Sequence, residues 1–322
     1  MPFAAPPLAP FTTTIAGIRA EMNTAAKAGA PGCVAVVAVA LAGAWGLLRV
    51  ANWNDDWWRE PATLASLVAY PIALWIVWKV GASFAAPETA RAEQAWARLV
   101  DEVMPAVLAT LRPGARFDAR ATAPRDYLER SRLSRAASMT TGNQLRWRAQ
   151  DLDLECYAIH CVERGDGPGV DRYFIGLLAR TAVAGFIDDF HVVAKSRRRF
   201  PDQVPAPHED TAIAGFDLDA DYRVISNWEP FARAVLTPDV QRALRAVAAD
   251  GPVTHVSVAN GAVWIGVEDE RPWFADFPQF SFGFIDALDD AHVAALGERL
   301  DRIDRLAAIV AAAVRAQIAS AH

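Results

Sequence analysis

Three side chains in the middle of the sequence are of the types that bind transition metals. Cys156, His160 and Cys161 lie within one short segment, and thiolate and imidazole groups are the usual protein ligands of zinc. The residues around them have the composition of a β-strand, which places residues 156 and 160 on one face but roughly 13 Å apart, and residue 161 on the other. Zinc requires ligands at about 2.0–2.3 Å. We therefore predict that these residues bind no metal.

Three alternating aspartates, Asp217, Asp219 and Asp221, resemble the first ligands of a calcium-binding loop. That loop also requires a glycine at its sixth position and a glutamate at its twelfth. This chain has Tyr222 and Trp228 at those positions. The aspartates are therefore predicted to form a solvated turn between two strands, and we expect no metal or other cofactor.

A dense basic run at Lys195, Arg197, Arg198 and Arg199 has two interpretations. It is either a solvated turn or a contact with anionic lipid, in which each basic side chain contributes about 1 kcal/mol. The sequence has no glycine-rich phosphate loop, no G-x-S-x-G and no H-E-x-x-H motif. His208 stands beside Glu209 and Asp210, a combination too common to identify a catalyst. No catalytic residue is therefore assigned from the sequence.

Two long uncharged segments precede these candidates. Residues 28–48 are an uncharged run of 21, and residues 61–78 are one of 18. At 1.5 Å per residue the first run spans roughly 31 Å, which is the thickness of the hydrocarbon core of a bilayer. Buried helices of soluble domains, the alternative, are rarely uncharged on all sides. We predict a transmembrane helical hairpin at residues 28–80.

The segment between the two runs, NWNDDWWRE at residues 52–60, combines three tryptophans with charges of both signs. Indole rings favour the membrane–water interface, and the charged side chains there need water. Lys and Arg residues close to the spans number two inside the turn and five outside it. This bias predicts a multi-pass protein of the bacterial inner (plasma) membrane with both termini in the cytoplasm.

Composition limits the classes of partner. The 322 residues are 53% hydrophobic and carry a net charge of −6. From residue 81 onward, 27 basic residues stand against 34 acidic ones, a net of −7. A domain this acidic is not a general nucleic-acid binder. Three cysteines without a pairing pattern imply no disulfide framework.

The rest of the chain is predicted to be an α+β domain, because strands mostly adjoin strands. Helices are expected at residues 88–111 with a break at Pro105, at 237–250 with Thr237 as N-cap, and from about Asp289 to the end. The expected strands are residues 144–150, 152–162, 171–181, 190–196, 211–218, 221–228 and 253–268, the last being a hairpin that turns at Asn260-Gly261.

The last helix carries an apolar stripe at spacings of three and four, formed by Val293, Leu296, Leu300, Ile303, Ala307, Val310 and Val314. A stripe of this kind packs either on the sheet of its own domain or on a second subunit. We favour the sheet, because Leu306 and Ile309 add a second apolar edge.

The order of segments resembles that of a family of uncharacterised bacterial proteins with two membrane spans and a domain of unknown function. The resemblance covers residues 85–285 and is best in FDLDADYRVISNWEPFARAVLTPDVQRAL, YLERSRLSRA, YFIGLLA and VSVANGAVWIGVE. Gly142-Asn143-Gln144 departs from it, because the family tends to have a glycine-acid-aspartate turn there. TAVAGF also departs, where the family tends to be polar. The resemblance implies an architecture and no active site.

These observations predict an irregular cytoplasmic tail at residues 1–27, the hairpin at 28–80 and a cytoplasmic α+β domain at 84–322. The expected function is that of a membrane-anchored binding protein, acting as a scaffold or regulator with an unknown protein partner. The alternative is a membrane-bound hydrolase or lipid-modifying enzyme whose residues converge only in the fold. A pocket that gathers His191, His208 or His255 with acids would favour the enzyme.

Overall fold

The computed structural model describes most of the chain after residue 89 and part of what precedes it. The described residues are 8–24, 27, 72, 75, 79, 90–124, 126–131, 138–164, 171–183, 189–194, 209–218, 221–248, 253–268 and 288–320. The chain divides into two compact units, one formed by Phe11–Glu102 and the other by Met1–Pro10 together with Val103–His322.

The unit Phe11–Glu102 is helical where it is described, at residues 12–24 and 90–98, the first following the 3-10 turn η1 (Ala9–Phe11). Ile15, Ile18 and Met22 are buried, at the spacing of one helix face. Arg98 forms a salt bridge with Glu21. The segment 1–27, predicted to be irregular, therefore contains a helix, because its prolines are confined to the first ten residues.

The predicted membrane hairpin lies outside the described residues, apart from Ile72, Trp75 and Lys79. Within the part of the chain that is described, no helix combines the length and the apolar composition that crossing a membrane requires. The Trp75 side chain is 58% exposed, and the Lys79 ammonium nitrogen lies 5.9 Å from the centre of its ring. The hairpin stays a prediction.

The expected break at Pro105 is a change of helix type. A π-helical turn, η3 (Leu99–Val103), precedes α3 (Met104–Leu111), whose first turn contains Pro105. Proline cannot donate a backbone hydrogen bond and clashes with the carbonyl four residues earlier, so the wider turn accommodates it. The helix ends after Leu111, and Gly114 follows with a φ of 82°, as predicted from the RPG sequence.

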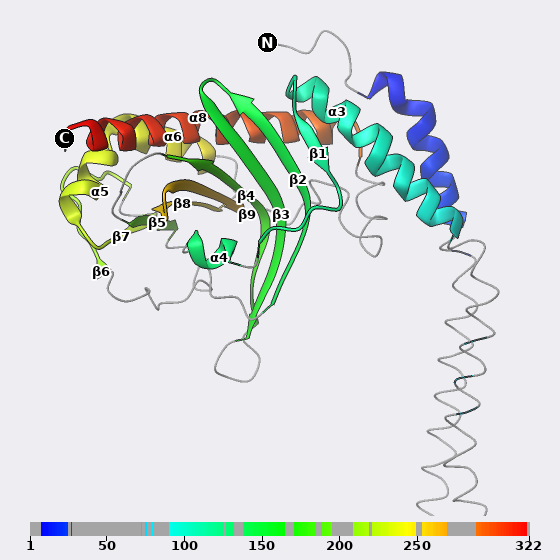
Figure 1. Cartoon of the computed structure of the whole chain (residues 1–322), viewed down its shortest axis with the longest axis horizontal. Coiled ribbons are helices and arrows are strands. Elements are labelled where there is room, and N and C mark those ends of the chain that lie inside the picture. Colours follow the sequence, from blue (N-terminus) through cyan, green and yellow to red (C-terminus); the bar gives the residue numbers. More distant parts are fainter. Residues whose placement is uncertain are drawn as a thin grey trace, which may run out of the picture. The chain divides into compact units, whose positions relative to one another are not determined.

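The larger unit is built on an antiparallel sheet of nine described strands, in the order β1-β2-β3-β4-β9-β8-β5-β7-β6 (Figure 1). The strands are β1 (Arg116–Asp118), β2 (Ser138–Ala149), β3 (Leu152–Arg164), β4 (Asp171–Ala182), β5 (Phe190–Ala194), β6 (Glu209–Asp210), β7 (Tyr222–Ser226), β8 (Val253–Ala259) and β9 (Ala262–Glu268). The predicted α+β class with an antiparallel sheet is confirmed for this unit.

Two tight turns set the register of the central strands. Asn260 and Gly261 have φ values of 52° and 72°, the left-handed pair that a two-residue hairpin needs and that Asn-Gly adopts readily. This hairpin, β8–β9, is as predicted. Gln150 and Asp151 join β2 to β3 in another two-residue connection, with a positive φ of 56° at Gln150 alone.

The segment 211–218, predicted to be a strand, consists of turns. Gly215 has a φ of 81°, and the Phe216 N–H donates to the Ile213 carbonyl at 3.1 Å. The Gln241 side chain holds these turns: its oxygen accepts from the Asp217 N–H at 2.8 Å, and its nitrogen donates to the Gly215 carbonyl at 3.1 Å. These side-chain bonds replace the ladder of a strand.

Short helices complete the described part of this unit: α4 (Tyr127–Arg130), α5 (Glu229–Val235) and α6 (Pro238–Ala248). Helix α6 begins as predicted, since the Thr237 hydroxyl accepts from the Val240 N–H at 3.4 Å and the Thr237 carbonyl from the Gln241 N–H at 3.0 Å. Helix α5 was not predicted.

The last helix, α8 (Asp290–Ser320), packs within its own domain. All seven residues of the predicted stripe are buried in the single chain. Asp289 caps the helix by accepting from the His292 N–H at 2.7 Å. The Trp147 indole N–H of β2 donates to Asp304 at 2.7 Å, so α8 covers one face of the sheet (Figure 1). The preference for packing on the sheet is confirmed.

Placing aspartates at Leu300 and Ile303 should unfold the domain at any protein concentration. Both side chains are fully buried. Each substitution removes about 1.5–3 kcal/mol of hydrophobic stabilisation and places a charge in the core. The exposed Ala312→Asp on the same helix is the control, which should cost less than about 1 kcal/mol. Thermal unfolding and sedimentation measure both. A folded double variant that only changes from dimer to monomer would contradict this packing.

Candidate functional site

A row of charged side chains crosses four strands on the sheet face opposite α8. Residues directly opposite in antiparallel strands point to the same face. The register places Arg116 of β1 opposite Arg146 of β2, Arg146 opposite Glu155 of β3, and Glu155 opposite Arg180 of β4. One carboxylate therefore stands in a row with three guanidinium groups.

The Glu155 carboxylate is the centre of this row. The Arg180 guanidinium donates to one of its oxygens at 2.9 Å, and the Tyr127 hydroxyl donates to the same oxygen at 2.6 Å. Its other oxygen lies 3.4 Å from the Gln144 amide nitrogen and 3.8 Å from Arg146 Nε. The Glu155 side chain is only 15% exposed, so these partners are what keep a carboxylate stable at the edge of a core.

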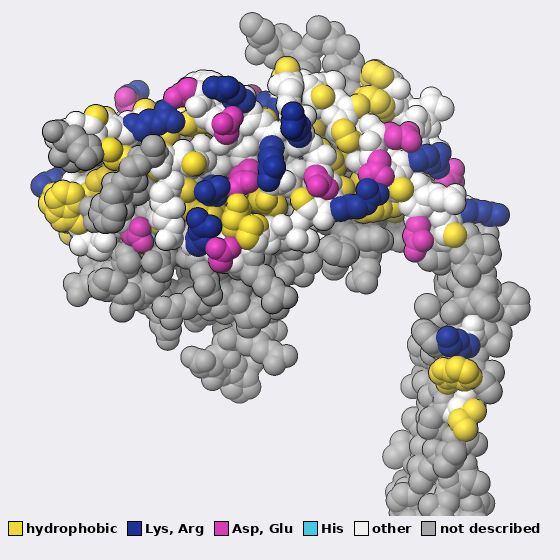
Figure 2. Space-filling model, viewed as in Figure 1, with side chains coloured by type: hydrophobic (Ala, Val, Ile, Leu, Met, Phe, Trp, Pro, Cys, Tyr) yellow, Lys and Arg dark blue, Asp and Glu magenta, His cyan; other side chains and the backbone are white. Residues whose placement is uncertain are grey.

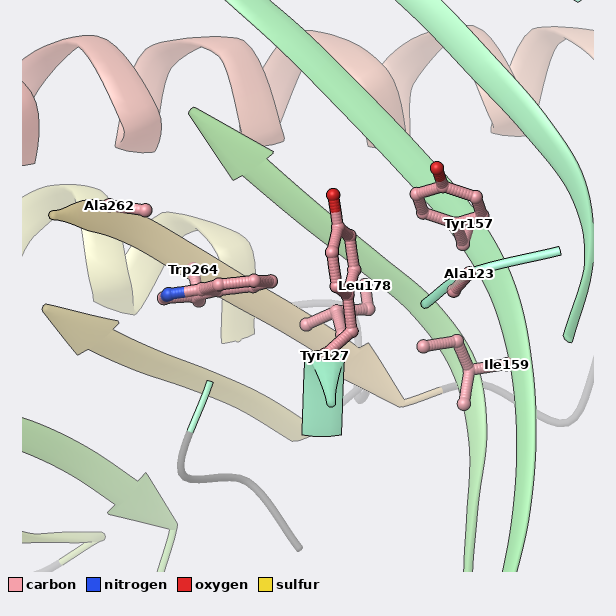
Figure 3. Packing of buried hydrophobic residues seen from close by; sticks show 7 residues of the cluster. All are labelled: Ala123, Tyr127, Tyr157, Ile159, Leu178, Ala262 and Trp264. Carbon is pink, nitrogen blue, oxygen red and sulfur yellow. The ribbon is translucent and has the colours of Figure 1, made fainter. Parts of the chain in front are cut away.

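Aromatic rings form the floor beneath the charges. Tyr127 projects from α4 between Tyr157 of β3 and Trp264 of β9 (Figure 3), with ring centres at 5.5 Å and 5.1 Å in edge-to-face geometry. The Arg180 guanidinium lies 5.3 Å from the Trp264 ring centre and 5.8 Å from that of Tyr127. Arg180 is thus held by a carboxylate on one side and by two π faces on the other. Ala123, Ile159, Leu178 and Ala262 complete the cluster.

Both phenols of this floor stay protonated. Burial, followed by the hydrogen bond to Glu155, raises the pKa of Tyr127 far above its ordinary value. Burial and the negative charge of Glu155 also raise the pKa of Tyr157. At neutral pH the Tyr127 hydroxyl therefore donates to Glu155, the Tyr157 hydroxyl accepts from the Gln144 amide, and neither serves as a base.

A β-bulge brings Gln144 into the site. The register between β2 and β3 shifts between Gly142 and Gln144, and the intervening Asn143 has a φ of 58°. The extra residue turns the Gln144 side chain toward Tyr157 and Glu155, and its amide donates to the Tyr157 hydroxyl. Residues 142–144, where the sequence departs from the turn of the family that it resembles, thus form a bulge inside a strand.

An open cleft of about 410 Å³ lies over the charged row. We call it the arginine cleft; its lining residues are Gly114, Arg116, Arg146, Trp147, Arg148, Asp153, Leu154, Glu155, Arg180 and Ala182. The Arg146 side chain is 61% exposed, so it faces solvent. Figure 2 shows basic, acidic and hydrophobic side chains interspersed on the viewed side of the described part.

The cleft has more positive than negative charge. Four arginines and two acids line it. Arg146 and Arg180 pair with Glu155, and Asp153 lies directly opposite Arg148. Arg116 lies directly opposite another arginine, an arrangement that costs free energy unless an anion screens it. The lining is suited to holding an oxyanion.

The prediction that Cys156, His160 and Cys161 lie on one β-strand is confirmed, because all three belong to β3. Cys156 is buried among the apolar residues under α8, and burial raises the pKa of its thiol. The His160 and Cys161 side chains lie outside the described residues. Among the side chains that are described, no group of His, Cys, Asp or Glu is arranged to hold a metal ion. The absence of zinc stays a prediction.

The other sequence candidates lie away from the cleft or outside the described residues. Asp217 is paired with Arg245 at 3.2 Å, as suits a solvated turn, whereas Asp219 is outside. Lys195, Arg197, Arg198, Arg199 and His208 are also outside. His191 and His255 are buried in the sheet, and His191 Nδ1 lies 2.8 Å from Ser257 Oγ. Of these residues, the described Asp217, His191 and His255 do not line the arginine cleft.

The arginine cleft was missed by sequence reasoning, although a signal for it exists. The segments QLRWRAQ and LDLECY alternate charged with apolar residues. Folding them back on each other through a two-residue turn at Gln150-Asp151 sets Arg146 opposite Glu155 and Arg148 opposite Asp153. Arg180 and Tyr127 come from separate elements, and no local pattern links them to this hairpin.

Comparisons with models of known families, with curated proteins and with solved structures gave no match for this chain. The resemblance to two-span membrane proteins therefore stays a prediction, and the site has to be interpreted from its own geometry.

Replacing Tyr127 by Phe should cost about 1 kcal/mol of unfolding free energy at pH 8, because the hydrogen bond to Glu155 is lost. The raised phenol pKa means that the folded state keeps its proton above pH 10, where the unfolded chain loses it. The Tyr127 phenol therefore makes the free energy of unfolding of the wild type fall by up to about 1.4 kcal/mol per pH unit above 10, an effect that the variant lacks. The gap between wild type and variant should therefore shrink from pH 10 to 11 in urea unfolding. A constant gap would show that Tyr127 does not titrate as inferred.

Proposed function

We propose that this chain is a membrane-anchored binding protein whose cytoplasmic α+β domain holds an anionic ligand in the arginine cleft. The observation that carries the proposal is the pair Arg116 and Arg146, directly opposite each other in the lining of an open cleft. Like charges in that position are unfavourable in the empty protein. A bound anion turns the repulsion into two charge-assisted hydrogen bonds.

Binding is a better account of this cleft than catalysis. The described lining contains arginines, carboxylates and apolar residues, and no Ser, Thr, Cys or His. Glu155 already accepts hydrogen bonds from Arg180 and Tyr127, so it is not poised as a general base. The rival enzyme hypothesis required a pocket that gathers histidines with acids, and His191 and His255 are buried away from this cleft.

The membrane part of the proposal rests on the two uncharged runs within residues 28–80. We propose that they span the inner membrane with both termini in the cytoplasm, which keeps the domain near the bilayer. The basic run at Lys195, Arg197, Arg198 and Arg199 is proposed to contact anionic lipid, and a scaffold or regulatory role with a protein partner is compatible with both.

The topology is tested by cysteine labelling. In a variant whose three native cysteines are replaced, a cysteine at Asn54 should react with a membrane-impermeant thiol reagent in intact cells, because the turn faces outward. A cysteine at Ser320 should react only after lysis. The opposite pattern of labelling would overturn the cytoplasmic placement of the domain.

Anion binding is tested by thermal unfolding of the full chain in detergent with inorganic phosphate, against chloride of equal ionic strength. A ligand of the folded state stabilises it by about 2.7 kcal/mol at a hundredfold of its Kd. Arg116→Gln with Arg146→Gln should abolish this gain. Arg242→Gln, an exposed arginine of α6 outside the cleft, should leave it intact. Equal stabilisation of both variants would refute the cleft as the site.

A further inference from the structure

We infer that the ligand of the arginine cleft is a phosphate monoester, a dianionic group carried on an organic body. The inference rests on the proposed function, and it names the class of ligand from two properties of the cleft. One property is the number of arginines that no acid neutralises. The other is the size and mixed character of the lining.

The first property is charge. The four arginines and two acids of the lining leave a formal excess of two positive charges. Arginine stays protonated at every physiological pH, so this excess is permanent. A monoanion such as a carboxylate or a sulfate ester neutralises half of it. A phosphate monoester carries close to two negative charges at neutral pH, because its second pKa is about 6.

The second property is geometry. Arg116, Arg146 and Arg148 stand on two neighbouring strands, so their guanidinium groups approach a ligand from one wall of the cleft. Arg180 stands on the opposite side of Glu155, fixed by that carboxylate and by the Trp264 ring. A tetrahedral group with three terminal oxygens can accept from several guanidinium groups at once, and the forked donors of arginine match it.

The volume of the cleft leaves room for more than inorganic phosphate. About 410 Å³ lies in the range of pockets that hold small organic ligands. Gly114 and the exposed Ala182 add apolar surface to the same cleft, which suits the organic part of an ester. Phosphate monoesters come from two sources near a membrane: soluble metabolites and lipids with a phosphate monoester headgroup.

The decisive comparison is methyl phosphate against methyl sulfate, two tetrahedral esters of nearly equal size that differ by one charge. Calorimetric titration of the full chain in detergent at pH 7.5 should show methyl phosphate binding at least about tenfold more tightly. Equal affinities would overturn the inference while leaving the proposed anion site standing. Absence of binding by both esters and by inorganic phosphate would overturn the proposed function as well.

Two single substitutions with opposite expected effects separate the charge argument from any folding defect. Arg116→Gln lowers the excess charge and should weaken methyl phosphate by about three- to tenfold. Asp153→Asn raises the excess and should strengthen it by a similar factor. Both side chains are exposed, so neither change should unfold the protein. Loss of affinity in both variants would contradict the charge argument, and Arg242→Gln again serves as control.

A second arm identifies the source of the ester. The full chain is reconstituted in phosphatidylcholine vesicles that contain either phosphatidate or phosphatidylglycerol at matched surface charge. If methyl phosphate binds more weakly in the phosphatidate vesicles alone, the lipid competes for the cleft. That result would support a phosphate monoester ligand that comes from a lipid headgroup. If methyl phosphate binds equally in both kinds of vesicle and soluble glycerol 3-phosphate competes with it, the result would support a phosphate monoester ligand that is a soluble metabolite. Competition by neither ester would overturn the inference.

Discussion

Helix α8 covers one face of the sheet, and this contact decides the direction of every side chain in the central strands. Leu300 and Ile303 are fully buried against the domain. Trp147 of β2 is tied to Asp304 of α8. Since side chains alternate along a strand, Arg146 and Arg148 must then point to the opposite face. A slip of one residue would bring arginines under the helix, so the apolar stripe of α8 fixes the arginine cleft from the far side of the sheet.

Glu155 is the second element on which the site depends. A carboxylate that is mostly shielded from water is costly unless its oxygens are paired. Here Arg180, Tyr127 and Gln144 supply those partners from three different elements. The same bonds orient Arg180 over the Trp264 ring. The carboxylate therefore fixes the positions of the cationic groups, and the aromatic floor keeps water from competing with it.

Local features of the sequence predicted those elements whose cause is local. Asn260-Gly261 specifies the β8–β9 hairpin because its two residues tolerate positive φ, and the stripe of α8 repeats at helical spacing over many turns. The segment 211–218 was mispredicted as a strand because its conformation is held by Gln241, a residue of α6. The cleft escaped prediction for the same reason: Arg180 and Tyr127 join the β2–β3 hairpin only through sheet order.

The charge of the cleft opposes that of its domain, and this contrast bears on selectivity. The chain from residue 81 onward carries a net charge of −7, which repels anions at long range, whereas the lining of the cleft is positive. Long-range attraction therefore cannot be what recruits an anion, and screening of exposed charges beyond about 8 Å at physiological salt weakens every long-range effect further. Recognition must come from short contacts in the cleft. Three of its arginines stand on neighbouring strands of one sheet, which lowers the entropy lost on binding. The smaller entropy loss offsets the unfavourable electrostatic field of the acidic domain around the cleft.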